Sequence, residues 1–350
     1  MDKNGFTSTL IMPWRRAAHT IHVQLTPDGQ LLESDFDAQL EKYAGQVALV
    51  AITGASNVTG YLNPIHRLAE KAHHAGAYIL VDAAQLAPHR QIDMLDLDDP
   101  AHLDFVTISA HKLYAPYGTG ALVGRKDIFS QGDPDQQGGG TVEIVTLDNV
   151  VWAGLPDRDE AGSPTTVGAV ALAAAIIQLQ AVRMDRVAEH EADLTGYALQ
   201  QLNKIDNVML YGDRDPENAS QRLGVLPMSV KGISHFKVAA ILGYEFGIGV
   251  RSGCFCAHPY ILHLLGLSSD QAHQVQARML DGDKSDMPGL IRASFGLYNT
   301  PEEVDYFVDA IKRIVRGSFM GNYLQERASG EYTPTDWSPN FDRYFKFQPL

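Results

Sequence analysis

Cysteine is nearly absent from this chain: its 350 residues include only two, Cys254 and Cys256. Because a single residue separates them, a disulfide between them would be strained, and we expect both to remain thiols in a reducing compartment. No uninterrupted apolar run of about eighteen residues occurs, which argues against a membrane span. The N-terminal residues MDKNGFTSTL also lack the apolar centre of a secretion signal, so a cytoplasmic location is expected.

Positive charge is scarce as well. The chain has 28 Lys and Arg residues against 42 Asp and Glu residues, giving a formal net charge of -14. Its Lys and Arg residues form no cluster, and contacts to a phosphate backbone need a basic face, so a nucleic-acid partner is not expected. The remaining composition, 45% hydrophobic and 20% charged, is typical of a globular chain with one large core and a smaller domain.

Helix and strand patterns alternate between Glu33 and Gly124. Such alternation predicts an α/β fold built on a mainly parallel sheet. The segment Ser130–Gly140 is rich in Gly, Asp, Pro and Gln and is predicted to be a loop. The Ala-rich segment Val167–Leu179 is apolar on nearly all sides, which predicts a buried helix.

The pattern changes near Asn203, beyond which the predicted strands are shorter. We therefore expect a large domain over residues 1–203 and a smaller α+β domain over residues 204–316. Residues 317–350 form a tail in which aromatic residues follow no clear period. Isolated exposed aromatics are unfavourable, so the tail is expected to cross the molecule or a partner subunit.

The most informative segment is Leu103–Gly120, in which Lys112 follows an apolar run and stands close to Ser109 and His111. Burial disfavours the charged form of lysine, so a lysine at a strand end usually serves chemistry such as Schiff-base formation. An upstream apolar run ends in Asp82. Ligands of parallel sheets bind beyond the carboxyl ends of strands, so Asp82 and Lys112 are expected to reach one small molecule. The alternatives are a surface lysine and an aspartate that caps a helix.

Together these segments resemble the pyridoxal-phosphate (PLP) enzymes of the class V aminotransferase superfamily, in particular cysteine desulfurases and selenocysteine lyases. The resemblance extends from about Pro13 to about Arg316. Its motifs, in chain order, are AITGASNVTG, VDAAQ, SAHK, GGG, EAGSPTT, VRSGCFCA and IRASFGLYNT. It implies the PLP-transferase fold type I, PLP as the cofactor, and release of sulfur or selenium from cysteine or selenocysteine to give alanine.

The resemblance also implies how the coenzyme is held. Lys112 matches the residue that forms the Schiff base, and Asp82 matches the acid that keeps the pyridine nitrogen protonated. Gln85 matches the residue that hydrogen-bonds the phenolic oxygen of the ring. Ser109 and His111 match positions that bind the phosphate. His111 by itself is equally consistent with a structural histidine.

Substrate and subunit contacts follow from the same resemblance. Arg292 and Asn57 match the groups that hold the substrate carboxylate, and Arg251 is a second, weaker candidate for that contact. The planar fork of arginine suits a carboxylate because it donates two parallel hydrogen bonds. The freed amine of Lys112 is expected to remove the α-proton. Ser163 matches a residue that reaches the phosphate in the neighbouring subunit, which implies a homodimer.

The thiols have different expected roles. Cys256 matches the catalytic cysteine, which would attack the sulfur of the substrate and carry a persulfide to a sulfur-acceptor protein. Cys254 stands where many desulfurases have histidine, and the Gly-Cys-Phe-Cys segment also resembles molybdenum cofactor sulfurases, so the acceptor stays open. A metal site of Cys254, Cys256 and His258 lacks a second ligand cluster, and no metal is expected. The histidines His73, His74 and His89 are expected on the surface.

One departure concerns the start of the chain. The resembling enzymes have a further N-terminal segment that supplies a coenzyme-binding turn and a group stacked on the pyridine ring. Here the matching position is Phe6–Thr9, which lacks the expected histidine. Three functions therefore stay open: a cysteine desulfurase or selenocysteine lyase, another class V aminotransferase or β-lyase, and a catalytically impaired truncated member that binds a partner.

Overall fold

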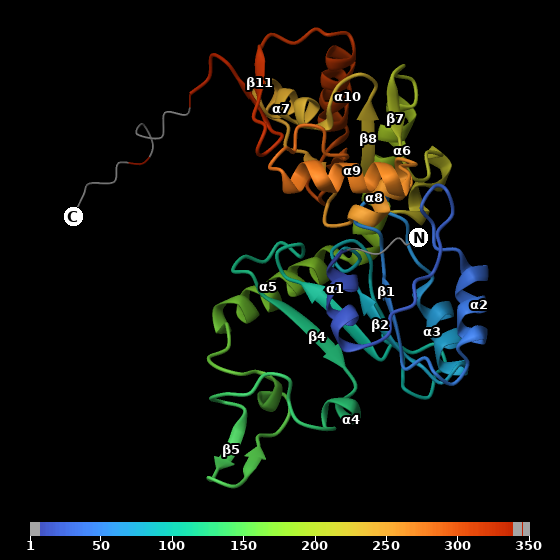
Figure 1. Cartoon of the computed structure of the whole chain (residues 1–350), viewed down its shortest axis with the longest axis vertical. Coiled ribbons are helices and arrows are strands. Elements are labelled where there is room, and N and C mark those ends of the chain that lie inside the picture. Colours follow the sequence, from blue (N-terminus) through green and yellow to red (C-terminus); the bar gives the residue numbers. More distant parts are fainter. Residues whose placement is uncertain (1–7, 339–344, 346–350) are drawn as a thin grey trace.

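The computed structural model describes residues 8–338 and residue 345, which form two lobes, one around each of two four-stranded sheets (Figure 1). The helices are α1 Ser8–Ala17, α2 Glu33–Lys42, α3 Ile65–His74, α4 Lys126–Phe129, α5 Thr166–Val182, α6 Met184–Leu202, α7 His235–Phe246, α8 His258–Leu264, α9 Ser269–Leu280 and α10 Pro301–Val315, with short 3-10 turns at Asp157–Asp159 and Pro216–Gln221. The strands are β1 Leu49–Thr53, β2 Tyr78–Asp82, β3 Phe105–Ser109, β4 Gly120–Gly124, β5 Val142–Val145, β6 Val150–Trp152, β7 Val208–Leu210, β8 Val225–Val230, β9 Arg251–Gly253, β10 Leu290–Ser294, β11 Tyr323–Gln325 and β12 Tyr332–Pro334.

The first lobe is built on the sheet β1-β2-β3-β4. Strands β1, β2 and β3 are parallel, and β4 pairs with β3 in the antiparallel sense. Ile52, Ile79 and Val81 are buried at alternate positions of β1 and β2, where Leu68 and Ala72 of α3 pack into the same core. The predicted α/β fold with a mainly parallel sheet is confirmed, and this sheet brings the carboxyl ends of β2 and β3 to one edge.

The second lobe is built on the antiparallel sheet β7-β8-β10-β9. Its core combines strand and helix residues, including Leu199, Met228, Ile241, Ile291 and Ile311 from α6, β8, α7, β10 and α10. Helix α6 precedes the predicted domain boundary at residue 203 yet contributes to this second core. The domain division of the sequence stays a prediction.

Helix α5 forms where it was predicted, but the prediction that it is buried is wrong. Only Gly168, Leu172 and Leu179 are buried along it, while Val170 and Ile177 are more than 60% exposed. The described chain offers no neighbouring element to cover this face. In residues 8–338 no single helix is long and apolar enough to cross a membrane; α5 and α6 pass that test only as a pair, and they are bent by 75°.

The predicted loop Ser130–Gly140 contains no helix or strand, as expected, and the hairpin of β5 and β6 follows it at the end of the first lobe farthest from the second (Figure 1). In the tail, β11 and β12 form a hairpin against α7, where the rings of Tyr244 and Trp337 meet edge to face with 4.9 Å between their centroids. The predicted stacking position at Phe6–Thr9 lies outside the residues whose side chains the structure describes.

Candidate functional site

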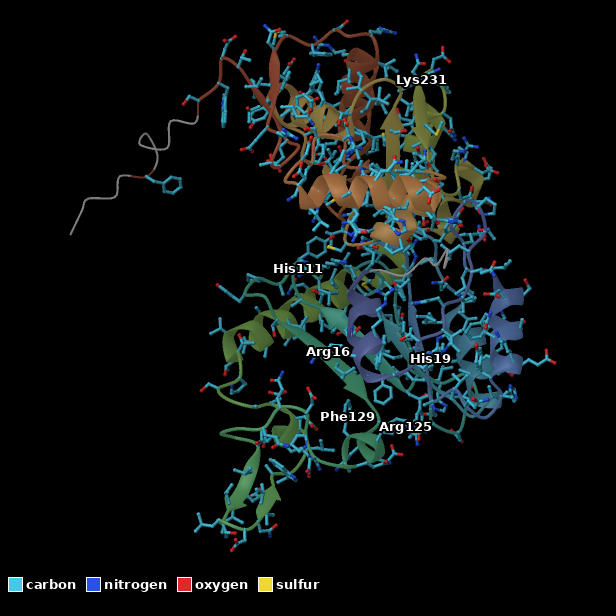
Figure 2. All side chains as sticks on the ribbon, viewed as in Figure 1. Arg16, His19, His111, Arg125, Phe129 and Lys231 are labelled. Atoms are coloured by element: carbon cyan, nitrogen blue, oxygen red, sulfur yellow. The ribbon has the colours of Figure 1, made fainter. Side chains whose placement is uncertain are left out.

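Polar groups from both lobes converge beyond the carboxyl ends of β2 and β3. Strand β2 ends at Asp82, β3 ends at Ser109, and Lys112 lies in the turn that follows. His111 in that turn lies at the end of the sheet that faces the second lobe (Figure 2). Arg292 of β10 comes from the second lobe and is close enough to act electrostatically on Lys112. The structure thus brings together residues that the sequence places far apart.

The environment of Lys112 lowers the pKa of its amine. Burial is the largest cause and the positive charge of Arg292 is the next, with a smaller contribution from Arg251. The charges of Asp82 and Cys256 act in the opposite direction without reversing the shift. At a given pH, Lys112 therefore has a larger neutral, nucleophilic fraction than an exposed lysine. Its predicted alternative, a surface lysine, does not fit this burial.

Asp82 fixes the turn that follows β2. Its Oδ1 accepts a hydrogen bond of 3.0 Å from the backbone N–H of Ala84. The predicted alternative, a helix cap, is wrong, because residues 83–90 form turns and no helix lies between β2 and β3. The same carboxylate also raises the pKa of Lys112, which requires it to lie near the amine. Capping of the turn fixes the carboxylate in place, and its charge is still available to a ligand in the site.

A chain of hydrogen bonds runs from Lys112 into the second lobe. The Nζ of Lys112 donates to Oε1 of Gln85 at 3.0 Å, and Nε2 of Gln85 lies 3.5 Å from Nε2 of His89. The opposite ring nitrogen of His89 lies 2.8 Å from Oε1 of Glu191, and Nη1 of Arg90 lies 2.6 Å from Oε2 of the same carboxylate. Gln85 is thus held in orientation by groups outside the immediate site.

Glu191 on α6 and His89 are functional candidates that the sequence did not indicate. The prediction that His89 lies on the surface is wrong, because its side chain is only 12% exposed. The spacing of four between Gln85 and His89 is a weak signal for one shared face. Glu191 follows more than a hundred positions later, and no local pattern connects it with them.

Ser109 and His111 form a polar pair at the rim of the site. The Oγ of Ser109 lies 2.9 Å from Nδ1 of His111, and the backbone N–H of Lys112 donates to the carbonyl of Ser109 at 3.2 Å. His111 is exposed, so its ring is accessible to a ligand. The pair provides neighbouring hydrogen-bonding groups of the kind that an anionic phosphate requires.

Arg292 is fixed in the site by one hydrogen bond, and part of the donor capacity of its guanidinium is not satisfied. Its Nη1 donates to the backbone carbonyl of Asn57 at 2.5 Å, and Nδ2 of Asn57 donates to the carbonyl of Phe255 at 2.8 Å. The guanidinium also lies over the Phe255 ring, 5.2 Å from its centroid. Burial, with the nearby charge of Arg251, lowers the pKa of Arg292 to about 10. Its Nε is buried and has no hydrogen-bond partner among the described residues, which is costly unless an anionic ligand accepts from it.

Arg251 lies directly opposite Arg292, on β9 paired with β10, and is exposed. Two like charges at paired positions repel each other. An anion between them would relieve that repulsion. The structure therefore keeps both arginines near one site, with Arg292 the more enclosed of the two.

The loop after β9 presents the two cysteines differently. Cys254 is buried, its Sγ donates to the carbonyl of Pro288 at 3.1 Å, and burial raises its pKa to about 11. Cys256 is exposed and, like Phe255, has a positive φ, 60° and 51° respectively. A positive φ at non-glycine residues is an uncommon conformation that often marks functional loops. With this backbone conformation, the loop encloses the thiol of Cys254 and leaves that of Cys256 accessible.

Two further predictions concern Ser163 and a metal site. Ser163 is exposed on the segment before α5, and within residues 8–338 it makes no hydrogen bond to the groups around Lys112. The metal alternative at Cys254, Cys256 and His258 finds no support either. In the part of the chain that the structure describes, the side chains that converge as metal ligands lie elsewhere.

The site fits a ligand with a carbonyl carbon, a ring nitrogen and a phosphate. The neutral amine of Lys112 suits the carbonyl, the carboxylate of Asp82 suits a protonated ring nitrogen, and the pair of Ser109 and His111 suits the phosphate. The unpartnered Nε of Arg292 calls for an additional anionic group. These features define an α/β protein whose sheet edge carries a lysine site that fits such a ligand.

Comparison with known proteins specifies the family. Residues 4–307 match the class V aminotransferase family. A probable cysteine desulfurase from Halobacterium salinarum is 35% identical over 294 residues, covering 84% of this chain and 63% of the relative. A cysteine desulfurase from Enterobacter sp. is 36% identical over 310 residues, covering 87% of this chain and 68% of the relative. The apo structure of a cysteine desulfurase from Thermococcus onnurineus has a TM-score of 0.76 at 30% identity, covering 89% of this chain and 71% of that one.

The chain belongs to the class V aminotransferase family, and its fold is PLP-transferase fold type I. The resemblance predicted from the ordered motifs is thereby confirmed. The chain spans 63% to 68% of the length of these two curated relatives.

Proposed function

We propose that this chain is a PLP-dependent cysteine desulfurase that converts cysteine to alanine and carries the released sulfur on Cys256. The observation that carries the proposal is the convergence of a lysine of lowered pKa, an enclosed arginine with an unpartnered Nε and an exposed cysteine at one site. Relatives that are named cysteine desulfurase, at 35% and 36% identity, support it.

The coenzyme is held by Lys112, Asp82, Gln85, Ser109 and His111, in the roles that the family resemblance implies. Bound PLP supplies an electron sink that stabilises negative charge at the α-carbon of the substrate. Asp82 holds a proton at the pyridine nitrogen, Gln85 orients the ring through its amide, and the pair of Ser109 and His111 binds the phosphate. The anchored Asp82 and Gln85 support these roles, because both side chains are fixed by hydrogen bonds.

The substrate carboxylate binds to Arg292, with Asn57 beside it. The Nε of Arg292 donates to the carboxylate, which satisfies a buried donor that otherwise has no partner. Arg251 supplies further positive charge at the rim. The neutral amine of Lys112 then removes the α-proton of the substrate, and its lowered pKa favours the neutral form needed for that step.

Sulfur transfer falls to Cys256. Its thiolate attacks the γ-sulfur of the substrate, forming an S–S bond while the Cβ–S bond breaks, and the electron pair of that bond remains with the three-carbon product. Protonation of that product gives alanine, and the persulfide stays on Cys256 for an acceptor thiol. Selenocysteine presents the same groups to the site, so we include selenocysteine lyase activity in the proposal.

The proposed assembly is a homodimer in the cytoplasm. Ser163 is exposed and, within residues 8–338, makes no hydrogen bond to the groups around Lys112, so its hydroxyl is available to the phosphate in a neighbouring subunit. The exposed apolar face of α5, which follows Ser163 directly, supports a subunit contact there. The proposed chemistry also needs free thiols, which a reducing compartment preserves.

Two comparisons of variants test the proposal. Purified protein mixed with PLP should develop a visible absorption band that is absent in Lys112→Ala and is lost on borohydride reduction. With cysteine as substrate and dithiothreitol to reduce the persulfide, Cys256→Ala should lower sulfide release by about 100-fold or more, whereas the matched variant Cys254→Ala should retain it. Equal sulfide release by Cys256→Ala and wild type would favour a different class V reaction, and a missing lysine-dependent band would favour an impaired chain.

A further inference from the structure

A second cluster of chemically active side chains lies at the opposite end of the first sheet. His73 lies in the last turn of α3, and His102 and Asp104 lie just before β3 begins. Arg125, which forms an ion pair with Asp104, lies at the end of the sheet farthest from His111 (Figure 2). The cluster is therefore separate from the proposed coenzyme site. His73 was predicted to lie on the surface, which is wrong, because its side chain is 18% exposed.

Both histidines direct their Nε2 atom toward the carboxylate of Asp104. Nε2 of His73 lies 2.9 Å from Oδ2 of Asp104, and Nε2 of His102 lies 3.3 Å from Oδ1. The three ligand atoms lie within 4.8 Å of one another. In a tetrahedral zinc site with bonds of about 2.0–2.1 Å, neighbouring ligand atoms are roughly 3.4 Å apart. The observed spacing accommodates such an ion with only small side-chain movements.

Hydrogen bonds to the backbone fix which ring nitrogen faces the carboxylate. Nδ1 of His73 lies 2.7 Å from the carbonyl of Pro100, and Nδ1 of His102 lies 2.7 Å from the carbonyl of Asp99. A carbonyl only accepts, so both Nδ1 atoms carry the hydrogen. In a neutral ring, Nε2 then has the free lone pair. Metal-ligating histidines show this arrangement, since the nitrogen that does not bind the metal donates to a carbonyl or carboxylate.

The carboxylate is equally well fixed. Asp104 is fully buried, accepts the backbone N–H of Ile79 at 2.8 Å, and has Nη1 of Arg125 at 3.2 Å. The rings of His73 and His102 stack above it with centroids 4.2 Å apart. Two lone pairs facing one carboxylate repel unless a cation lies between them.

We propose that His73, His102 and Asp104 form a binding site for one Zn²⁺ ion. Two imidazole nitrogens and one carboxylate oxygen are a ligand set that suits zinc better than magnesium or calcium, which prefer oxygen alone. A water molecule completes the coordination, because the partly exposed His73 leaves one side of the cluster open. The ion links α3 to the segment that enters β3.

Zinc content of the purified full chain tests this assignment. The measurement uses Cys256→Ser protein, so that the accessible thiol takes up no metal. After chelator treatment, ZnCl₂ is added, excess is removed by gel filtration, and zinc is counted by mass spectrometry. The expected content is about one zinc per chain, with a thermal midpoint at least about 3 °C higher than that of the chelated protein.

Three variants in that background locate the ion. His73→Gln and His102→Gln should each lose the bound zinc, and the matched variant His74→Gln, at an exposed neighbour on the same helix, should retain it. Circular dichroism confirms folding, and His73→Gln decides the outcome if the more buried variant fails to fold. Zinc uptake by His73→Gln that equals that of His74→Gln overturns the proposal. Absence of zinc from the Cys256→Ser parent also overturns the proposal. The cluster is then held by hydrogen bonds alone.

Discussion

The chemistry of Lys112 depends on charges that surround it in space. Burial and the positive charge of Arg292 lower its pKa, while Asp82 and Cys256 oppose that shift. A neutral amine is the form that reacts with the coenzyme. The residue that binds the substrate carboxylate in our proposal therefore also affects the reactivity of the lysine.

We predict that Arg292→Gln moves the pH dependence of coenzyme capture upward. The substitution removes one cause that lowers the Lys112 pKa, so the amine becomes neutral only at higher pH. The midpoint for the rate at which the lysine-dependent absorption band appears should therefore rise to a higher pH. Arg251→Gln should shift it less, because Arg251 makes a smaller contribution. An unchanged or lower midpoint in Arg292→Gln contradicts this account.

The two cysteines should be separable by a thiol reagent. At pH 8 the native protein should react with Ellman's reagent rapidly at one thiol, since Cys256 is exposed and Cys254 is buried with a pKa raised to about 11. Cys256→Ser should abolish the fast phase, and Cys254→Ser should preserve it. Two equally fast thiols in the native protein would disprove the enclosed position of Cys254.

Strand-end reasoning predicted the meeting of Asp82 with Lys112, because the ends of neighbouring parallel strands share one edge of a sheet. The same reasoning could not find Glu191. Arg90 and Glu191 are 101 positions apart and meet only in the folded chain, where Glu191 lies on α6. The positive φ of Phe255 and Cys256 also follows from packing, since neither residue type favours that conformation.

At the scale of elements, α6 is fixed by a buried carboxylate. Burial alone would raise the Glu191 pKa, but the hydrogen bond from His89, the charges of His89 and Arg90, and the Gly224 N–H lower it below its ordinary value. A carboxyl whose folded-state pKa is lowered stabilises the fold above its unfolded-state pKa. This stabilisation is lost as pH falls through the folded-state pKa.

We predict that Glu191→Ala destabilises the protein by about 3–5 kcal/mol at pH 7, because it leaves Arg90 as a partly buried charge and the Gly224 N–H without an acceptor. Glu191→Gln keeps the acceptor for Gly224 and should cost less. Urea unfolding followed by circular dichroism measures both. The difference between wild type and Glu191→Ala should shrink at pH 3, and a difference independent of pH would exclude the carboxylate as its source.

Element position and element burial differ in how well the sequence predicts them. Helix α5 forms over Thr166–Val182 because its Ala-rich sequence favours helix, so its existence was predictable. Its burial was not, since an apolar helix is covered only if another element packs on it. Val170 and Ile177 show that within the described chain nothing does.

At the scale of the whole molecule, periodicity gave the α/β character but not the way in which the lobes meet. The order β7-β8-β10-β9 places β9 beside β10, and this pairing sets Arg251 opposite Arg292 beside the proposed coenzyme site. Strands that pair out of chain order depend on contacts between distant residues, for which a single sequence contains no local signal.

The last prediction concerns the subunit contact proposed at α5. Light scattering after gel filtration should give a dimer for the wild type, and Ile177→Glu should shift it toward monomer, because it places a charge on an apolar face that is 61% exposed in the single chain. Met209→Glu, at an exposed apolar residue of β7 in the other lobe, is the matched control and should stay dimeric.

If Ser163 serves the coenzyme of the neighbouring subunit, the monomeric variant should also bind PLP more weakly, by about 10-fold or more. A dimer that survives Ile177→Glu places the subunit contact elsewhere, and a wild-type monomer that retains PLP removes the role proposed for Ser163.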